Sequence, residues 1–245
     1  MNSAKRAFRF QKYGSKKSIL GFWSVILTIN ILTYILSIYF NPKVKIGLFN
    51  GNDDLYSIAG ANLMPIFIFF IVYGISMYHE DFALALSFGI TRKDFYKSVI
   101  VDNIIVTSSF AAIQCILQIV DKHIIESLGH NPMVEFGLFN TSTNNILSIF
   151  LVSFIIFLAL VSVTNLLGVL HYRFGYKFWI GFALIFIVLQ MSINFITRPI
   201  TGISELYSWL ISQFGNSTIF ILEFLIIIIC YTIGYFLMRK ANIRK

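Results

Sequence analysis

The chain has 245 residues, of which 57% are hydrophobic and only 12% are charged. Soluble domains keep about a quarter of their residues charged, so this composition excludes an ordinary soluble protein and indicates a surface that mostly faces lipid. The net charge of +8 does not indicate nucleic-acid binding, because the basic residues stand in short clusters between apolar runs and form no continuous face. No cluster of Cys and His suggests a metal site.

The first 17 residues are basic and amphipathic. On a helical wheel, Ala7 and Gln11 fall on one side, and Lys5, Arg9 and Lys12 fall on the opposite side. This pattern predicts an amphipathic helix over residues 1–17 that lies in the inner membrane interface, with its cations near the headgroups of anionic membrane lipids. A frayed basic tail that only sets the topology is the alternative.

Six apolar segments are long enough to cross a bilayer core of about 30 Å. They cover residues 19–40, 60–78, 99–120, 146–170, 178–197 and 218–238. No small-residue cleavage site follows the first segment, so we expect it to stay in the mature protein as a transmembrane helix. The sequence therefore predicts an all-α integral membrane protein with six transmembrane helices, forming a single transmembrane domain over residues 1–245.

The orientation follows from the distribution of lysine and arginine. Most of them lie in the N-terminal tail, in segments 79–98 and 171–177, and at the C-terminal end. The other set of connections holds only Lys43, Lys45, Lys122 and Arg198. The positive-inside rule places the basic set in the cytoplasm, which predicts a multi-pass plasma-membrane protein with both termini inside.

The cytoplasmic segment 79–98 is polar enough to leave the bilayer but holds a short apolar stretch. We expect this stretch to form a helix that ends at Gly89, because glycine readily adopts the left-handed conformation of a helix C-terminus. Thr91 can cap a second helix, which begins with Arg92-Lys93-Asp94 and continues into the third span. The segment is thus predicted to be a helix–turn–helix elbow.

The elbow should present an apolar knob formed by Phe82, Leu86 and Phe88, beside Arg92 and Lys93. Exposed apolar residues in a charged cytoplasmic segment usually mark a contact with another protein. The alternative is that the elbow packs only on the N-terminal helix of its own chain.

Residues 85–96 read Ala-Leu-Ser-Phe-Gly-Ile-Thr-Arg-Lys-Asp-Phe-Tyr. This stretch resembles the coupling helix between the second and third spans in permease subunits of type-2 ABC exporters. The basic N-terminal helix, the six spans and the cytoplasmic termini extend the resemblance over most of the chain. It implies that the elbow docks on a cytoplasmic ABC ATPase, beside the N-terminal helix. The residues that would couple the chain to this ATPase are Glu80, Phe82, Leu86, Phe88, Gly89, Thr91, Arg92 and Lys93.

The same resemblance implies two ATPase subunits and a second permease copy or homologue as partners. ATP and magnesium would be bound by the ATPase, because no glycine in this chain is followed by lysine and the chain therefore lacks a P-loop. We expect no cofactor in the chain itself and no enzymatic activity of its own.

The third span carries a polar stripe. Asn103, Thr107, Gln114 and Gln118 fall within about 60° of one another on a helical wheel. In hydrocarbon such a stripe must face other helices or a wet path, so it could line the translocation path or the seam between two permease copies. Hydrogen bonds that only hold the bundle together are the alternative.

Two carboxylates fall inside predicted spans. Asp102 lies one turn inside the inner end of the third span, where it could reach Lys97 or the interface. Glu223 lies more than a turn into the sixth span, where a lone carboxylate is costly. We therefore include Glu223 among the candidate residues of the translocation path.

The outer segment 198–217 precedes the last span. Arg198-Pro199 should end the fifth span, and Gly202 and Gly215 flank an amphipathic stretch over 203–214. A re-entrant or interfacial helix is expected here, with an ordinary loop as the alternative. In the resembling family, short outer helices at this position close the substrate path.

The function that the sequence predicts is that of a permease subunit of an ATP-driven ABC exporter. The outer loops are small and the bundle is apolar and aromatic, which favours hydrophobic or amphiphilic cargo such as peptides or lipids. A stand-alone membrane protein of the immunity or scaffold type is one alternative. The substrate-binding membrane subunit of a vitamin importer is another.

Overall fold

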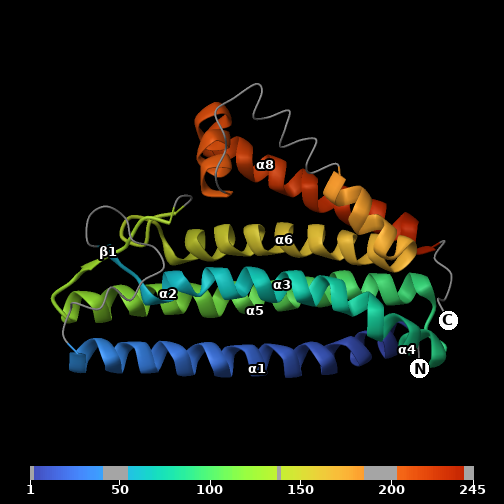
Figure 1. The fold of residues 1–245 in the computed structure, drawn as a ribbon, viewed down its shortest axis with the longest axis horizontal. Coiled ribbons are helices and arrows are strands. Elements are labelled where there is room, and N and C mark those ends of the chain that lie inside the picture. Colours follow the sequence, from blue (N-terminus) through green and yellow to red (C-terminus); the bar gives the residue numbers. More distant parts are fainter. Residues whose placement is uncertain (1–2, 41–54, 137–138, 185–202, 240–245) are drawn as a thin grey trace.

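The computed structural model describes residues 3–40, 55–136, 139–184 and 203–239, with the side chains of residues 3–4, 40, 79–80 and 203–218 left undescribed. Long helices run along one axis and account for most of this part of the chain (Figure 1). Five of them are long and apolar enough to cross a membrane. They correspond to the predicted spans 19–40, 60–78, 99–120, 146–170 and 218–238, the second of which ends at Ser76 as a candidate span.

The N-terminal segment and the first span form one helix, α1, over Ser3–Phe40. The sequence predicted a separate helix over residues 1–17 lying in the membrane plane, and the structure corrects this, because the helix continues through the junction. Ala7, Gln11 and Ser15 are buried against the rest of the molecule, so packing aligns the N-terminal part with the span that follows it. With 38 residues, α1 is about 57 Å long and exceeds the thickness of a bilayer core.

The second predicted span contains three elements. Helix α2 (Ile58–Ala61) is capped by Ser57, whose Oγ accepts a hydrogen bond of 2.8 Å from the Gly60 N–H. Helix α3 (Leu63–Ser76) follows and passes into a π-helix, η1 (Met77–Asp81). Helix α4 (Phe82–Ser87) then turns the chain back towards α5 (Arg92–Ser127).

Helix α6 (Ile146–Phe174) ends at Gly175, which has a φ of 65°, and residues 176–184 are helical again. The rest of the predicted fifth span, 185–197, lies outside the described residues. Helix α8 (Ile203–Arg239) combines the predicted outer helix and the last span. The sequence placed the end of the outer helix at Gly215, whereas the structure continues as helix through this residue.

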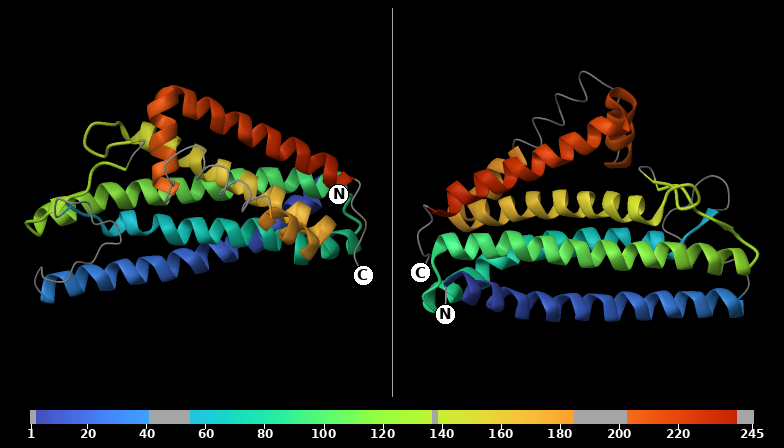
Figure 2. Two further views of the ribbon diagram at one scale, coloured as in Figure 1. Left: turned by 45° about the horizontal axis from the view of Figure 1, so that its top comes forward. Right: turned by 180° about the vertical axis from the view of Figure 1, so that it is seen from behind.

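The helices form a bundle with α1 and α8 at opposite edges, and α3, α5 and α6 between them (Figures 1 and 2). Helix α1 packs on α5, and α8 packs mainly on α6. The start of α1, helix α4 and the end of α8 meet at one end of the bundle, which we call the elbow end (Figure 1).

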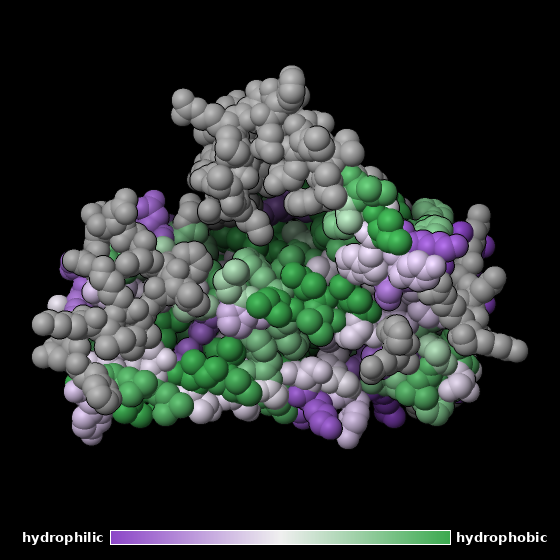
Figure 3. Space-filling view, in the orientation of Figure 1, coloured by the Kyte–Doolittle hydropathy of each residue, from purple (hydrophilic) through white to green (hydrophobic). Residues whose placement is uncertain are grey.

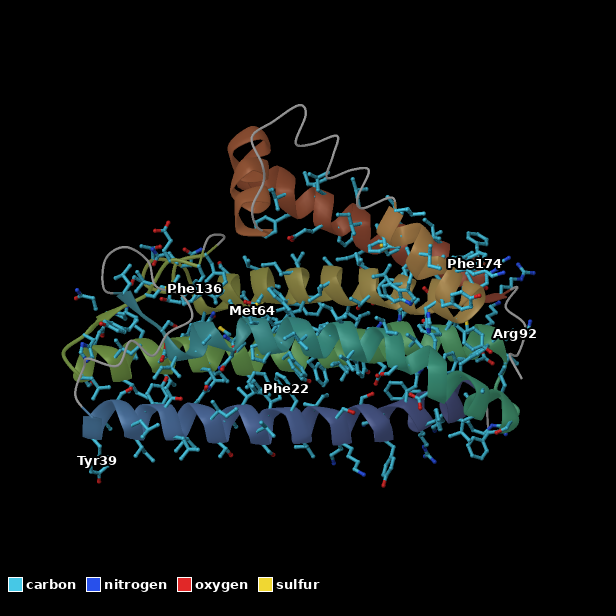
Figure 4. All side chains as sticks on the ribbon, in the orientation of Figure 1. Phe22, Tyr39, Met64, Arg92, Phe136 and Phe174 are labelled. Atoms are coloured by element: carbon cyan, nitrogen blue, oxygen red, sulfur yellow. The ribbon has the colours of Figure 1, made fainter. Side chains whose placement is uncertain are left out.

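The centre of the bundle is an aromatic core. Phe22 from α1 lies against Phe69 and Phe110, with ring centroids 4.9 Å and 5.1 Å apart, and its side chain points from α1 towards these neighbours (Figure 4). Phe70 contacts Phe157 of α6 at 5.5 Å. These stacked and tilted rings join α1, α3, α5 and α6 in one cluster.

At the end opposite the elbow, two short strands pair. Strand β1 (Leu55–Tyr56) runs parallel to β2 (Asn131–Pro132). Their pairing joins the two residues that precede the Ser57 cap of α2 to the segment after α5.

Candidate functional site

The elbow has the local structure that the sequence predicts. Gly89 has a φ of 70°, its N–H donates to the Leu86 carbonyl at 3.0 Å, and the Ile90 N–H donates to the Ala85 carbonyl at 3.2 Å. This pair of bonds is a Schellman motif, which ends α4 and satisfies its last carbonyls. Thr91 caps α5, accepting a hydrogen bond of 3.1 Å from the Asp94 N–H.

One face of the elbow is built into the bundle. The Phe82 ring lies 5.2 Å from Phe95 at the start of α5 and 5.1 Å from Tyr172 at the end of α6, measured between centroids. Ala85 and Ile90 are buried in the same cluster. Residues from α1, α5, α6 and α8 all contribute to this cluster, so α4 is buried in the same cluster as parts of four long helices and directly contacts α5 and α6 through Phe82.

The other face of the elbow is exposed, and its composition corrects the predicted knob. Phe82 is fully buried and cannot contact a partner, and Leu86 is only partly exposed. The large exposed apolar side chains are Leu84, at 47%, and Phe88, at 57%. Phe88 also contacts Phe10 of α1, with 6.1 Å between ring centroids.

The remaining predicted coupling residues surround this face. Gly89, Thr91 and Lys93 are exposed, and Arg92 is half-buried. Figure 4 shows Arg92 at the elbow end, at the same end of the bundle as Phe174. Glu80 lies in η1, and its side chain is outside the described residues.

Leu84 is a candidate that sequence reasoning missed. It precedes Phe88 by four residues, so both side chains lie on one face of a helix. Phe82 and Ala85 lie on the buried face instead. The i, i+4 spacing was therefore a usable signal, although a six-residue helix is too short for periodicity to show which face is buried.

The polar stripe of α5 faces the interior, as predicted. Asn103, Thr107, Gln114 and Gln118 are each at most 2% exposed. Asn103 Nδ2 donates to the Tyr231 hydroxyl of α8 at 3.1 Å, and Gln114 Nε2 donates to the Ala59 carbonyl of α2 at 2.8 Å. Asn103 and Gln114 thus bond to different helices.

The other stripe residues make weaker connections. Thr107 donates to the Asn103 carbonyl of its own helix at 2.7 Å. Both amide atoms of Gln118 are buried without a hydrogen-bond partner among the described residues.

Glu223, the remaining candidate for the translocation path, is 9% exposed. It lies on the buried side of α8, in line with Ile219 and Ile227.

Two buried carboxylates join α1 to α5. Asp102 accepts hydrogen bonds from the hydroxyls of Ser15 and Tyr73, which replaces the contact with Lys97 that the sequence suggested. At the other end, Asp121 accepts hydrogen bonds from Tyr34.

The Asp121 carboxylate has two further donors. The Ser57 hydroxyl lies at 2.7 Å and the Ile58 N–H at 3.3 Å. Asp102 and Asp121 are 1% and 2% exposed. Each carboxylate therefore replaces its lost hydration with donors from two other segments of the chain.

Comparison of the chain with models of protein families, with curated proteins and with solved structures finds no match. Its function has to be argued from its own geometry. At the elbow, exposed apolar side chains and exposed cations lie on a short helix whose other face is buried in a cluster shared with four long helices.

The two glutamines of the stripe should respond differently to replacement. Gln118→Leu removes an amide that has no hydrogen-bond partner among the described residues, so we expect unchanged or higher stability. Gln114→Leu removes the bond to Ala59 and should cost about 1 kcal/mol. Thermal unfolding of the two purified variants in one detergent checks this. If both variants are destabilised equally, the expected difference in stability between them is contradicted. If Gln118→Leu loses transport but keeps its stability, Gln118 belongs to the translocation path.

Proposed function

We propose that the chain is the permease subunit of an ATP-driven ABC exporter of the type-2 class. It pairs with a second permease copy or homologue and with two cytoplasmic ATPase subunits. The observation that supports the proposal best is that the elbow has one buried and one exposed face. Phe82 and Ala85 are buried in the bundle, whereas Leu84 and Phe88 are exposed.

The exposed face suits a docking contact. Leu84 and Phe88 lie at the end of the bundle where the basic residues gather, beside the exposed cation of Lys93. A groove on an ATPase would bury both apolar side chains, and full burial of one Leu or Phe is worth roughly 1.5–3 kcal/mol. An acidic rim on such a groove would pair with Lys93 and Arg92.

The buried face suits transmission of movement. Because α4 shares a cluster with parts of α1, α5, α6 and α8, a displacement of α4 by a docked ATPase would act on all four helices together. Helix α5 begins directly after the cap at Thr91, so it would receive the movement without an intervening flexible loop. Such coupling is the function that we assign to the elbow.

The proposal includes six spans in a plasma membrane, with both termini in the cytoplasm, where the elbow also lies. The partner ATPase binds magnesium and hydrolyses ATP, and this chain provides the path along which the cargo crosses the membrane. Hydrophobic or amphiphilic cargo, such as peptides or lipids, fits a bundle whose interior is largely aromatic.

The first test is recruitment of the ATPase. Phe88→Asp and Leu84→Asp should each weaken its co-purification about 10- to 100-fold, because each removes burial worth roughly 1.5–3 kcal/mol and places a carboxylate in the contact. Tyr176→Asp is the matched control, since Tyr176 is 70% exposed and follows α6. We expect this control to recruit the ATPase normally.

Folding has to be measured on the same samples. Phe82→Asp should lower the yield of folded protein, because Phe82 is fully buried, whereas Phe88→Asp should leave the yield near that of the native chain. If Phe88→Asp lowers the yield of folded protein but leaves co-purification of the ATPase unchanged, the only role of Phe88 is to pack against Phe10. A native chain that co-purifies with no ATPase would favour a stand-alone membrane protein.

A further inference from the structure

The N-terminal part of α1 carries cations and no carboxylates. Its six basic residues are all exposed, and the first acidic residue of the chain is Asp53. The basic residues are Lys5, Arg6, Arg9, Lys12, Lys16 and Lys17. Such a cluster next to a transmembrane helix attracts anionic lipid.

The packing of α1 fixes the direction in which these cations point. Ala7, Gln11 and Ser15 form the buried line of the helix. With 3.6 residues per turn, the six cations fall roughly 100° to 240° around the helix from Gln11. They therefore occupy the face opposite the bundle, and α1 itself is at the edge of the bundle (Figure 2).

The same face continues into the span as an apolar strip. Leu20, Leu27, Ile31 and Ile38 follow the cations on this side and are 59%, 37%, 58% and 61% exposed. In a transmembrane helix, exposed apolar side chains contact the acyl chains of lipids. Figure 3 shows hydrophilic side chains over the N-terminal part of α1, at the lower edge, with apolar ones further along.

Two tyrosines indicate the depth of the cations in the membrane. Tyr13 and Tyr39 are both 80% exposed, and the 26 residues between their positions correspond to about 39 Å of helix. A bilayer is about 40–45 Å thick with its headgroups, and exposed tyrosines favour its two interfaces. Tyr39 points away from the bundle at the far end of α1 (Figure 4). Lys12, Lys16 and Lys17 therefore lie at the level of the headgroups.

We propose that Lys12, Tyr13, Lys16 and Lys17 form a binding site for the headgroup of an anionic phospholipid. The acyl chains of this lipid lie along Leu20 and Leu27, one to three turns further along the same face. A zwitterionic lipid offers the same phosphate, but its own amine is repelled by the lysines. A soluble phosphate compound would not contact the apolar strip. The site is separate from the exposed face of the elbow and does not depend on the proposed ATPase.

Lipid selectivity of the full chain in vesicles tests the proposal. Spin-labelled phosphatidylglycerol and spin-labelled phosphatidylcholine are compared by the fraction of each that the protein immobilises. We expect the native chain to prefer phosphatidylglycerol by about fivefold or more, the effect of one cation near a membrane surface. The triple variant Lys12→Gln, Lys16→Gln and Lys17→Gln should lose most of this preference. Arginine at the same three positions should retain it.

A matched control separates a site from an effect of total charge. Lys97, Lys177 and Arg239 are exposed cations at the elbow end, and their replacement by glutamine removes the same charge. This control should keep the preference for phosphatidylglycerol. The proposal is overturned if the control loses the preference as the α1 variant does, or if the native chain shows none. Displacement of the labelled lipid by millimolar inorganic phosphate would also overturn it, by indicating a site for soluble phosphate.

Discussion

Replacement of Gly168 by leucine is expected to lower the free energy of unfolding by about 3 kcal/mol or more, at the upper end of what overpacking usually costs. Gly168 lies where α6 crosses α3, and a Cβ atom there would be 2.5 Å from the carbonyl oxygen of Gly74. The oxygen belongs to the backbone, so it can move only if the two helices separate. Small residues at such crossings let transmembrane helices approach closely.

Separation of α3 from α6 would also break the polar contacts around the crossing. The Tyr78 hydroxyl donates to Asn165 Oδ1 at 2.8 Å, and the Thr164 hydroxyl contacts the Phe70 carbonyl at 3.2 Å. Tyr78 and Asn165 are buried, so loss of the bond between them leaves polar atoms unsatisfied in an apolar interior. The Thr164 hydroxyl would keep its second contact, to the Val161 carbonyl at 3.1 Å. The effect of Gly168→Leu should therefore exceed that of a simple steric clash.

Gly21→Leu is the matched control for this prediction. Gly21 lies within α1, and apart from its own helix backbone and its chain neighbours, no atom of the described residues is within 4 Å of the position that its Cβ would take. Leucine there should be neutral or stabilising by up to about 1 kcal/mol, because glycine is a poor helix former. Unfolding of both variants in detergent, followed by circular dichroism, measures the difference. Equal stability of the two variants would show that α3 and α6 do not cross at Gly74 and Gly168.

The sequence predicts well those features that depend only on residues close to one another along the chain. The end of α4 at Gly89 and the start of α5 at Thr91 depend on residues within five positions of each other. The polar stripe of α5 was also predictable, because its spacing alone puts Asn103 and Gln114 on one side of a helix. The clustering of exposed cations on α1 follows from the same argument.

The features that sequence reasoning missed depend on which helices are neighbours. Phe82 was assigned to an exposed knob, but it fills a gap between α5 and α6 that no local pattern reveals. The hydrogen bond from Ser15 to Asp102 joins residues 87 positions apart. Continuity of α1 through residue 17 likewise depends on the packing of Ala7 and Gln11, since the composition changes there from basic to apolar.

The carboxylates of Asp102 and Asp121 on α5 both accept hydrogen bonds from α1 and hold the two helices rigidly against each other. Asp121 follows Asp102 by 19 residues, and Tyr34 follows Ser15 by the same number, so α1 and α5 are joined at two points about 28 Å apart. Sliding or rotation of one helix against the other would break both contacts. Because α5 starts at the elbow, a movement applied there would carry α1 with it and would reach the β1–β2 end of the bundle.

The Asp121 contact is expected to be the more sensitive of the two. Asp121→Ala should lower the free energy of unfolding by about 3 kcal/mol or more, because three donors lose their acceptor at once and each buried unsatisfied group costs about 1–3 kcal/mol. Asp121→Asn keeps one carbonyl oxygen and should lose less. His123→Ala is the control, since His123 is 71% exposed and lies on the same turn of α5.

A double-mutant cycle separates the α1 contact from the rest of the Asp121 environment. Tyr34→Phe alone should be mildly destabilising, and it should cost almost nothing when Asp121→Ala is already present, because its acceptor is then gone. The expected coupling is about 0.5–3 kcal/mol, the range measured for residues in direct contact. Denaturant titration of the four purified proteins in one detergent provides the cycle. Additive effects of the two substitutions would show that Tyr34 and Asp121 are not bonded, and the Asp102 contact would then be the only one of the two buried carboxylate contacts that joins α1 to α5.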